Sequence, residues 1–140
     1  MANQIHIYTN NPTASGTDGT LVSESGAQTS PISVTLNATN AEVKAVKLAI
    51  RCDAGYQVSG DTILTLTGTN AAKWALCADN SYADAAAALA GGTFASSLTL
   101  SGVVATSTIF WAKAMSSTDE VPVNDKTVSI QAVATIAATA

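Results

Sequence analysis

Nucleophilic catalysis needs a Ser, Cys or Thr next to a base, and the sequence offers one histidine for that role, His6. His6 lies in the alternating segment IHIY, which predicts a surface histidine on an edge strand rather than a general base. The nucleophile motif GxSxG is absent, as are the phosphate-binding motifs GxGxxG and GxxxxGKS/T. The sequence therefore predicts no enzyme, no catalytic residues, no cofactor and no cofactor-binding residues.

Two groups of acidic side chains are the candidates for a cation site. Oxygen-rich loops bind Ca²⁺ when several carboxylates and carbonyls converge. Neither group has the EF-hand spacing, and Pro122 stiffens one of them. We expect the acidic loop 119–125 to be a solvated turn between strands, with calcium binding as the alternative, and we assign no metal ligands. The first group comprises Asp119, Glu120, Asn124 and Asp125, and the second comprises Asp79, Asn80 and Asp84.

Aromatic side chains are too few to line a substrate groove. Glycoside hydrolysis would need facing carboxylates in such a groove, and the chain has two Trp, three Tyr and two Phe. Trp74 and Trp111 lie in strand-like segments among small residues, which favours a role as core anchors. The alternatives are a subunit interface or a carbohydrate-stacking platform, to which Tyr82 could contribute.

Cys52 and Cys77 have no CxxC motif and no histidine nearby, so a zinc site lacks ligands. Cys52 falls on the same alternating face as Val46, Leu48 and Ile50. This favours two buried free thiols, and a disulfide between adjacent strands is the alternative.

The elements that would position these residues are strands. Period-2 alternation of apolar and polar side chains recurs along the whole chain, and Gly, Asn, Asp and Ser separate the segments. This pattern predicts an all-β fold, an antiparallel β-sandwich of about eight strands. The expected strands cover residues 5–8, 32–36, 46–52, 62–67, 73–76, 98–100, 109–113 and 128–134.

Two stretches break the alternation within an expected single domain, residues 1–140. Residues 10–30 are rich in Gly, Ser, Thr and Asn and predict an extended arm or long loop, with a short strand at Leu21–Val22. Residues 81–90 predict one short helix, capped by Asn80 or Ser81, with Asp84 in its first turn. The pair Gly91–Gly92 would end it.

Low charge is the main feature of the composition. Of 140 residues 11% are charged, whereas globular proteins carry about 25%. Six basic side chains cannot neutralise a phosphate track, which excludes nucleic-acid binding. No window of 18 apolar residues is free of polar residues, so we expect no membrane partner. The start, MANQIHIY, lacks a signal-peptide pattern, which favours synthesis in the cytoplasm.

A surface with so little charge resists other chains weakly, and few Lys or Pro residues guard the edge strands. We therefore expect much of the surface to be covered by copies of this chain or by a partner. Residues 10–30 and the apolar segment 133–140 are the candidates for these contacts. The expected state is a homo-oligomer or an assembly subunit.

Three segments carry a resemblance to a known class of proteins: TDGTLVSESGAQTSPI, KAVKLAIRCDAGYQVSGDTILTLTGTNAAKWALCADN and TIFWAKAMSSTDEVPVNDKTVSI. In style and order they resemble the small β-rich virion-associated proteins of tailed bacteriophages and prophages. The resemblance implies an immunoglobulin-like or jelly-roll-like sandwich that decorates heads or builds tails and fibres. It also implies virion proteins as partners, a place in the virion after synthesis in the host cytoplasm, and no catalytic residues. The alternative function is a carbohydrate-binding or adhesin-type module.

Overall fold

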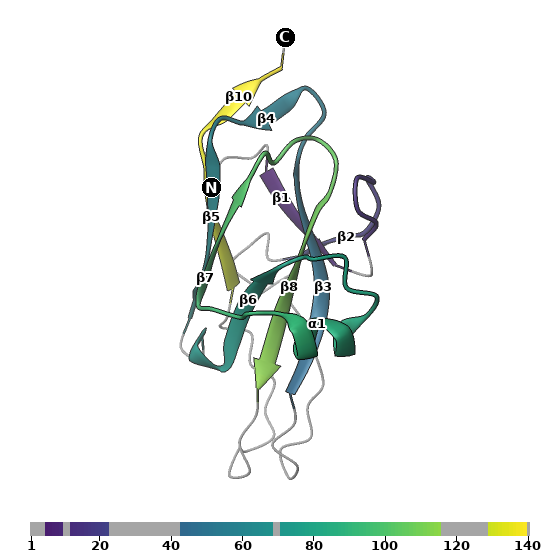
Figure 1. The fold of residues 1–140 in the computed structure, drawn as a ribbon. Helices are drawn as coiled ribbons and strands as arrows, with labels where there is room; N and C mark the ends of the chain where they lie inside the picture. Colours follow the sequence, from purple (N-terminus) through teal and green to yellow (C-terminus); the bar gives the residue numbers. More distant parts are fainter. Residues whose placement is uncertain (1–4, 10–11, 23–42, 69–70, 116–128, 140) are drawn as a thin grey trace.

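The alternating segments form ten antiparallel strands and one short helix in the computed structural model (Figure 1), which describes residues 5–9, 12–22, 43–68, 71–115 and 129–139. The predicted all-β antiparallel sandwich is confirmed. In chain order the elements are β1 (Ile5–Thr9), β2 (Thr20–Val22), β3 (Val43–Cys52), β4 (Tyr56–Val58), β5 (Asp61–Thr67), the 3-10 turn η2 (Ala71–Lys73), β6 (Trp74–Ala78), α1 (Ala85–Gly91), β7 (Ser97–Ser101), β8 (Thr108–Met115), β9 (Ser129–Val133) and β10 (Ile136–Ala138).

The strands are arranged in one large and two smaller sheets. The large sheet has the order β2-β1-β3-β8-β6, and a three-stranded sheet has the order β7-β5-β9. Strands β10 and β4 form a separate pair. The long β3–β8 ladder, from Val43 opposite Met115 to Ile50 opposite Thr108, forms the middle of the large sheet.

The main apolar core lies between the sheets. Alternation along each strand sends one set of side chains inward, and the inward sets of the large and three-stranded sheets join in one cluster that also contains Val103. The large sheet supplies Ile5, Ile7, Leu48, Ile50, Cys52, Leu76, Phe110 and Ala112, and the smaller sheets supply Val58, Leu64, Leu66, Leu100, Ile130 and Ala132.

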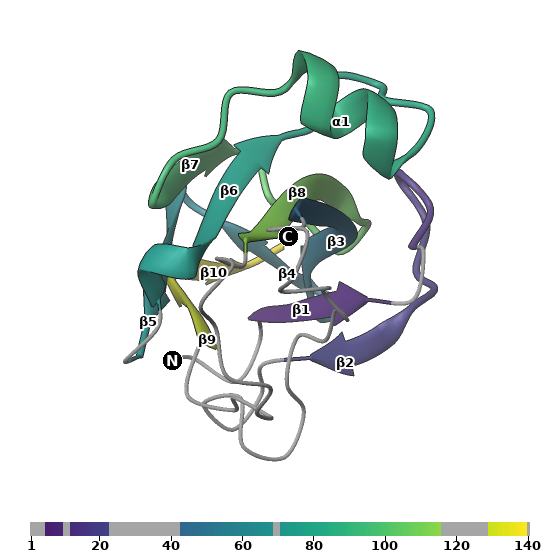
Figure 2. The ribbon, with the colours of Figure 1, turned by 90° about the horizontal axis from the view of Figure 1, so that it is seen from below.

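A second apolar cluster lies on the other face of the large sheet, where α1 packs. Figure 2 shows α1 and strand β9 on opposite sides of β8. Ala88 of α1 meets Ala49, Ile109 and Trp111 of the sheet, and all four side chains are buried. Strands β3 and β8 are therefore covered on both faces over part of their length, which makes the fold three layers deep at this point.

Several predicted boundaries need correction. The strand count of about eight is too low for the described residues, because the three-residue strands β4 and β10 are too short to show alternation. The predicted strand 32–36 lies outside the described residues. Predicted strand Leu21–Val22 is confirmed as part of β2. Since β2 pairs with β1, His6 lies on an interior strand of the sheet, and its predicted edge position is wrong.

Helix α1 begins later than predicted. Asp84 is its N-cap, with extended backbone and a carboxylate that accepts a hydrogen bond from the Ala87 amide at 2.9 Å. Ser81 has φ +58°, outside the helical region, so neither it nor Asn80 caps the helix. Asp84 belongs to the cap and not to the first turn.

In the described ranges no helix is long and apolar enough to cross a membrane.

The described part of the 10–30 segment, residues 12–22, is tied to the body of the protein. Ser15 donates its amide to the carbonyl of Ser107, and Ser107 donates to the carbonyl of Gly16, both at 2.9 Å. Thr13 binds the carboxylate of Asp18 with its amide and its hydroxyl, both at 2.8 Å. This segment is a tight loop that leads into β2. Residues 23–30 lie outside the described ranges.

Candidate functional site

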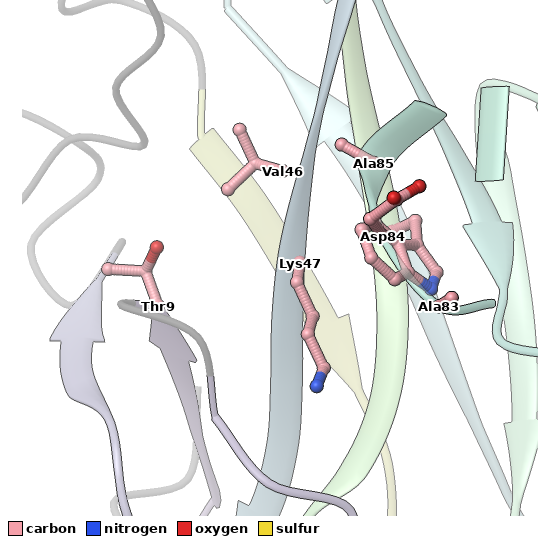
Figure 3. Close-up of a pocket in the computed structure, with 7 residues that line it drawn as sticks. Thr9, Val46, Lys47, Ala83, Asp84 and Ala85 are labelled. Carbon is pink, nitrogen blue, oxygen red and sulfur yellow. The ribbon is translucent and has the colours of Figure 1, made fainter. Parts of the chain in front are cut away.

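An open hollow of about 490 Å³ lies beside the start of α1, on the outer face of the large sheet. It forms where the loop before α1 meets the middle of β3 and β8, whose side chains flank it in Figure 3. The lining residues are Thr9, Val46, Lys47, Ala83, Asp84, Ala85 and Trp111.

The ionisable groups of the hollow are the Lys47 amine and the Asp84 carboxylate. Figure 3 shows the Lys47 amine directed away from Asp84. The Asp84 carboxylate already accepts the Ala87 amide as the helix cap. In the part of the chain that the structure describes, the hollow therefore offers one amine and the hydroxyl of Thr9, but no nucleophile paired with a base.

Trp111 is buried at the hollow, with 2% of its surface exposed. Its indole N–H donates to the Asp79 carboxylate at 2.9 Å. Tyr82 packs edge-on against its ring, with the centroids 6.4 Å apart. The predicted core role of Trp111 is confirmed, because its ring is buried in an apolar cluster and its indole N–H is hydrogen-bonded within the protein. Trp74 is half-buried and packs against the main core.

In the acidic group Asp79, Asn80 and Asp84, both carboxylates accept structural hydrogen bonds. Asp79 accepts the indole of Trp111, and Asp84 caps α1, so each carboxylate has its own structural bond. Among the described residues there is no cluster of three or more His, Cys, Asp or Glu side chains that could hold a metal. The loop 119–125 lies outside the described residues, and its calcium alternative stays a prediction.

Arg51 holds a buried network of hydrogen bonds that no sequence motif predicts. Its side chain is buried, with 7% exposed, at the end of β3. The guanidinium donates to the carbonyls of Thr17 at 2.7 Å and Asp18 at 2.8 Å, and to the hydroxyl of Ser107 at 2.9 Å. It also lies 3.5 Å from the centre of the Tyr8 ring. A planar, multi-donor cation suits this role, and the available signal was an arginine between the apolar residues Ile50 and Cys52.

The Asp18 carboxylate is hydrogen-bonded within its own loop. The amide and the hydroxyl of Thr13 donate to its two oxygens and hold its pKa below the ordinary aspartate value, and the nearby Arg51 charge adds to this. These bonds stabilise the ionised form. Asp18 therefore holds the 12–22 loop closed through its two hydrogen bonds with Thr13.

His6 lies next to a carboxylate. Its Nε2 is 3.3 Å from an Asp53 oxygen, and its ring meets Tyr8 edge-on with centroids 6.5 Å apart. His6 also lies opposite Arg51 in the β1–β3 ladder. The histidine and carboxylate thus join the polar cluster around Arg51, at the end of β3.

The two cysteines are free and buried, as predicted. Cys52 belongs to the main core and Cys77 to the cluster under α1, so they lie on opposite faces of the large sheet. Their strands, β3 and β6, are separated by β8. The alternative of a disulfide between adjacent strands is therefore excluded.

Comparison of the chain with protein-family models, curated proteins and solved structures finds no match.

Proposed function

We propose that this chain is a non-enzymatic structural subunit of a phage or prophage particle and works through contacts with other protein chains. The observation that carries the proposal is the outer face of the three-stranded sheet. Ile63, on the central strand β5, points away from the core and is 46% exposed. Its neighbours across the ladder include Thr99 of β7.

The side chains around Ile63 are almost uncharged. Those described on this face are Asp61, Thr65, Thr67, Ser97, Thr99, Ser101 and Gln131, with one carboxylate among them. Surfaces that resist association carry about 25–35% charged residues of both signs. A flat face of hydroxyls around an apolar centre has little of this protection, so it suits a protein contact.

The hydrogen bonds that charged side chains make within the protein support the same proposal. Arg51, Asp79 and Asp84 are each engaged in bonds that hold loops or the helix start. The particle and its virion location follow from the resemblance to small virion-associated proteins, and the sandwich fold fits that class.

A carbohydrate-binding module has less support. Stacking on sugars needs an exposed aromatic face, and the two Trp, three Tyr and two Phe of the chain, all described, are each buried or half-buried. Trp111 in particular is enclosed by Tyr82 and bound to Asp79.

Substitution of Ile63 by lysine tests the proposal. Particles released by lysis of the cells that encode this chain are purified on a density gradient and assayed for the chain by mass spectrometry. We expect the wild-type chain at a fixed ratio to the main particle protein. Ile63→Lys should be reduced by about tenfold or more, because the lysine would bury an unpaired charge in the contact, and tenfold corresponds to about 1.4 kcal/mol.

Val104→Lys is the matched control, because Val104 is exposed to 39% and lies outside this face. It should enter particles like the wild type, and all three proteins should melt at similar temperatures. Absence of the wild-type chain from particles would overturn the virion role. Normal entry of Ile63→Lys would overturn the role of this face.

A further inference from the structure

Strand β10 is an edge strand without the usual edge protection. It pairs with β4 at the top of the molecule in Figure 1, and among the described residues no other strand pairs with it. Its sequence, IAA, contains no charge and no proline. It lies in the apolar segment 133–140, which the sequence predicts as a segment for contacts. Such an edge is a template for pairing with another strand.

Two hydrogen bonds show which backbone groups of β10 face β4. Ser59 donates its amide to the carbonyl of Thr135, and Thr139 donates its amide to the carbonyl of Gly55, both at 2.8 Å. Both are directly opposed pairs when the β10–β4 register is extended by one position at each end. Hydrogen-bonded pairs alternate along an antiparallel ladder. The backbone groups of Ala137, midway between the two threonines, therefore face β4 as well.

The backbone groups of Ile136 and Ala138 consequently point away from β4. The described structure places no strand on that side of β10. Strand β4, in contrast, has a partner on both sides, because the amide of Val58 donates to the carbonyl of Val103 at 2.9 Å. The open edge of this small sheet is therefore the edge of β10, where Ala138 is exposed and Ile136 is half-buried against the main core.

Strand β10 is complementary to a second copy of itself. An antiparallel pair of two β10 strands centred on Ala137 would place Ile136 opposite Ala138 of the second copy, on both sides of the axis. These are the residues whose backbone groups face outward, so both pairs can exchange hydrogen bonds. Thr135 would lie opposite Thr139 of the second copy, and opposed threonines stabilise a cross-strand pair. Apolar side chains thus meet apolar ones, and hydroxyls meet hydroxyls.

We propose that two copies of this chain associate through β10, around a twofold axis at Ala137, and join their β4–β10 pairs into one continuous sheet. The contact is isologous, because the same strand serves on both sides. It is a form of β-strand addition, in which main-chain hydrogen bonds supply the affinity. The inference rests on the proposed structural role, which it deepens by naming a second copy as a partner.

A single cysteine at position 137 tests the axis. Directly opposed residues in a non-hydrogen-bonded pair have Cα atoms about 4.5 Å apart, within the range that a disulfide spans. Purified Ala137→Cys should form a covalent dimer on mild oxidation. Gln57→Cys is the matched control, because Gln57 lies opposite Ala137 on β4, one strand away from the axis. It should stay unlinked, as should the wild type, whose Cys52 and Cys77 are buried.

The register is tested by mixing two further variants. Thr135→Cys and Thr139→Cys change exposed side chains. Each should cross-link poorly alone and readily with the other, because residue 135 of one copy faces residue 139 of the second. Strong cross-linking of each variant with itself, and none in the mixture, would overturn this register. Absence of cross-linking by Ala137→Cys, or equal cross-linking by Gln57→Cys, would overturn the axis.

Ala138→Pro tests the main-chain bonds without a thiol. Proline has no N–H, and the N–H of Ala138 points away from β4, so the variant keeps the bonds between β10 and β4. Light scattering over a concentration series should show its dimer dissociation constant raised by about tenfold or more. Ala138→Ser keeps the N–H and should dimerise like the wild type. Thermal melts check that both variants are folded.

A wild-type chain that stays monomeric throughout the series, or a folded Ala138→Pro variant that dimerises like the wild type, would overturn the pairing. These measurements use the purified chain alone, whereas the particle role is tested by particle composition. A chain that enters particles but does not pair through β10 would leave the structural role in place and remove only this contact.

Discussion

At the scale of single residues, the buried charge of Arg51 is used to hold loops rather than to bind a ligand. Its three acceptors belong to the 12–22 loop and to Ser107, before β8. A buried guanidinium is tolerated only when its donors are satisfied. Arg51 thus links segments far apart in the sequence, and Asp18 closes the same loop by accepting both donors of Thr13.

Asp18 should make part of the free energy of unfolding depend on pH. Because its pKa is lower in the folded protein, its contribution is complete above about pH 4, the unfolded value, and is lost as pH falls through the lowered folded value. Asp18→Asn should therefore be less stable than the wild type near pH 6, and the difference should shrink towards pH 2. Urea unfolding at both pH values measures this.

Thr13→Val is the companion variant for this test. It keeps the Asp18 charge but removes the hydroxyl donor, so it should weaken the pH dependence without abolishing it. A constant difference between Asp18→Asn and the wild type at all pH values would mean that the carboxylate charge contributes nothing to folding.

At the scale of elements, helix α1 fits closely onto the large sheet because Gly92 ends it without a side chain. A Cβ at Gly92 would lie 2.6 Å from the Ala88 carbonyl oxygen and 2.8 Å from Cys77 Sγ. Gly92→Ala must therefore push α1 away from its cluster, at a cost of about 1–3 kcal/mol. Chemical denaturation measures the loss in unfolding free energy.

Gly91→Ala is the matched control, since the nearest atom to its Cβ would be a ring carbon of Tyr82, at 3.1 Å, and not backbone. Alanine is also the better helix former, which offsets part of any crowding. We expect a change of less than about 1 kcal/mol at this position. Equal losses for both variants would show that tight packing at Gly92 is not what holds α1.

The strands were predictable from alternation where one face meets the core and the other meets solvent. Val46, Leu48, Ile50 and Cys52 follow that rule and lie on the core side, as predicted. Burial of Ala49 on the second face was not predictable, because it depends on α1 lying over this part of β3. Nothing local in the sequence specifies where the helix packs.

The helix start and the site were predicted less well, for a related reason. Asn80, Ser81 and Asp84 are all good N-caps, and the structure uses Asp84, while Asp79 just before them binds Trp111 of β8. Arg51 likewise gains its role only when the 12–22 loop folds over it. Both depend on contacts between distant segments, which spacing along the chain does not reveal.

At the scale of the whole molecule, the large sheet separates the two cysteine environments. Burial raises the pKa of the Cys52 thiol, so it stays protonated and unreactive near neutral pH. Iodoacetamide should leave both cysteines of the folded chain unmodified for hours and label both at once when urea unfolds it. Mass spectrometry counts the adducts; rapid labelling of the native chain, or an intramolecular disulfide after mild oxidation, would contradict this arrangement.

The position of β1 also has a consequence for how the protein is made. Apart from β2, its neighbour is β3, and β3 in turn needs β8, which ends at Met115. The amino-terminal strands leave the ribosome first. A growing chain can close the β1–β2 hairpin early, but Ile5 and Ile7 have no sheet to cover them until most of the protein has been synthesised. The length of the nascent chain, more than the preference of any one segment, sets the earliest moment at which this fold can be completed.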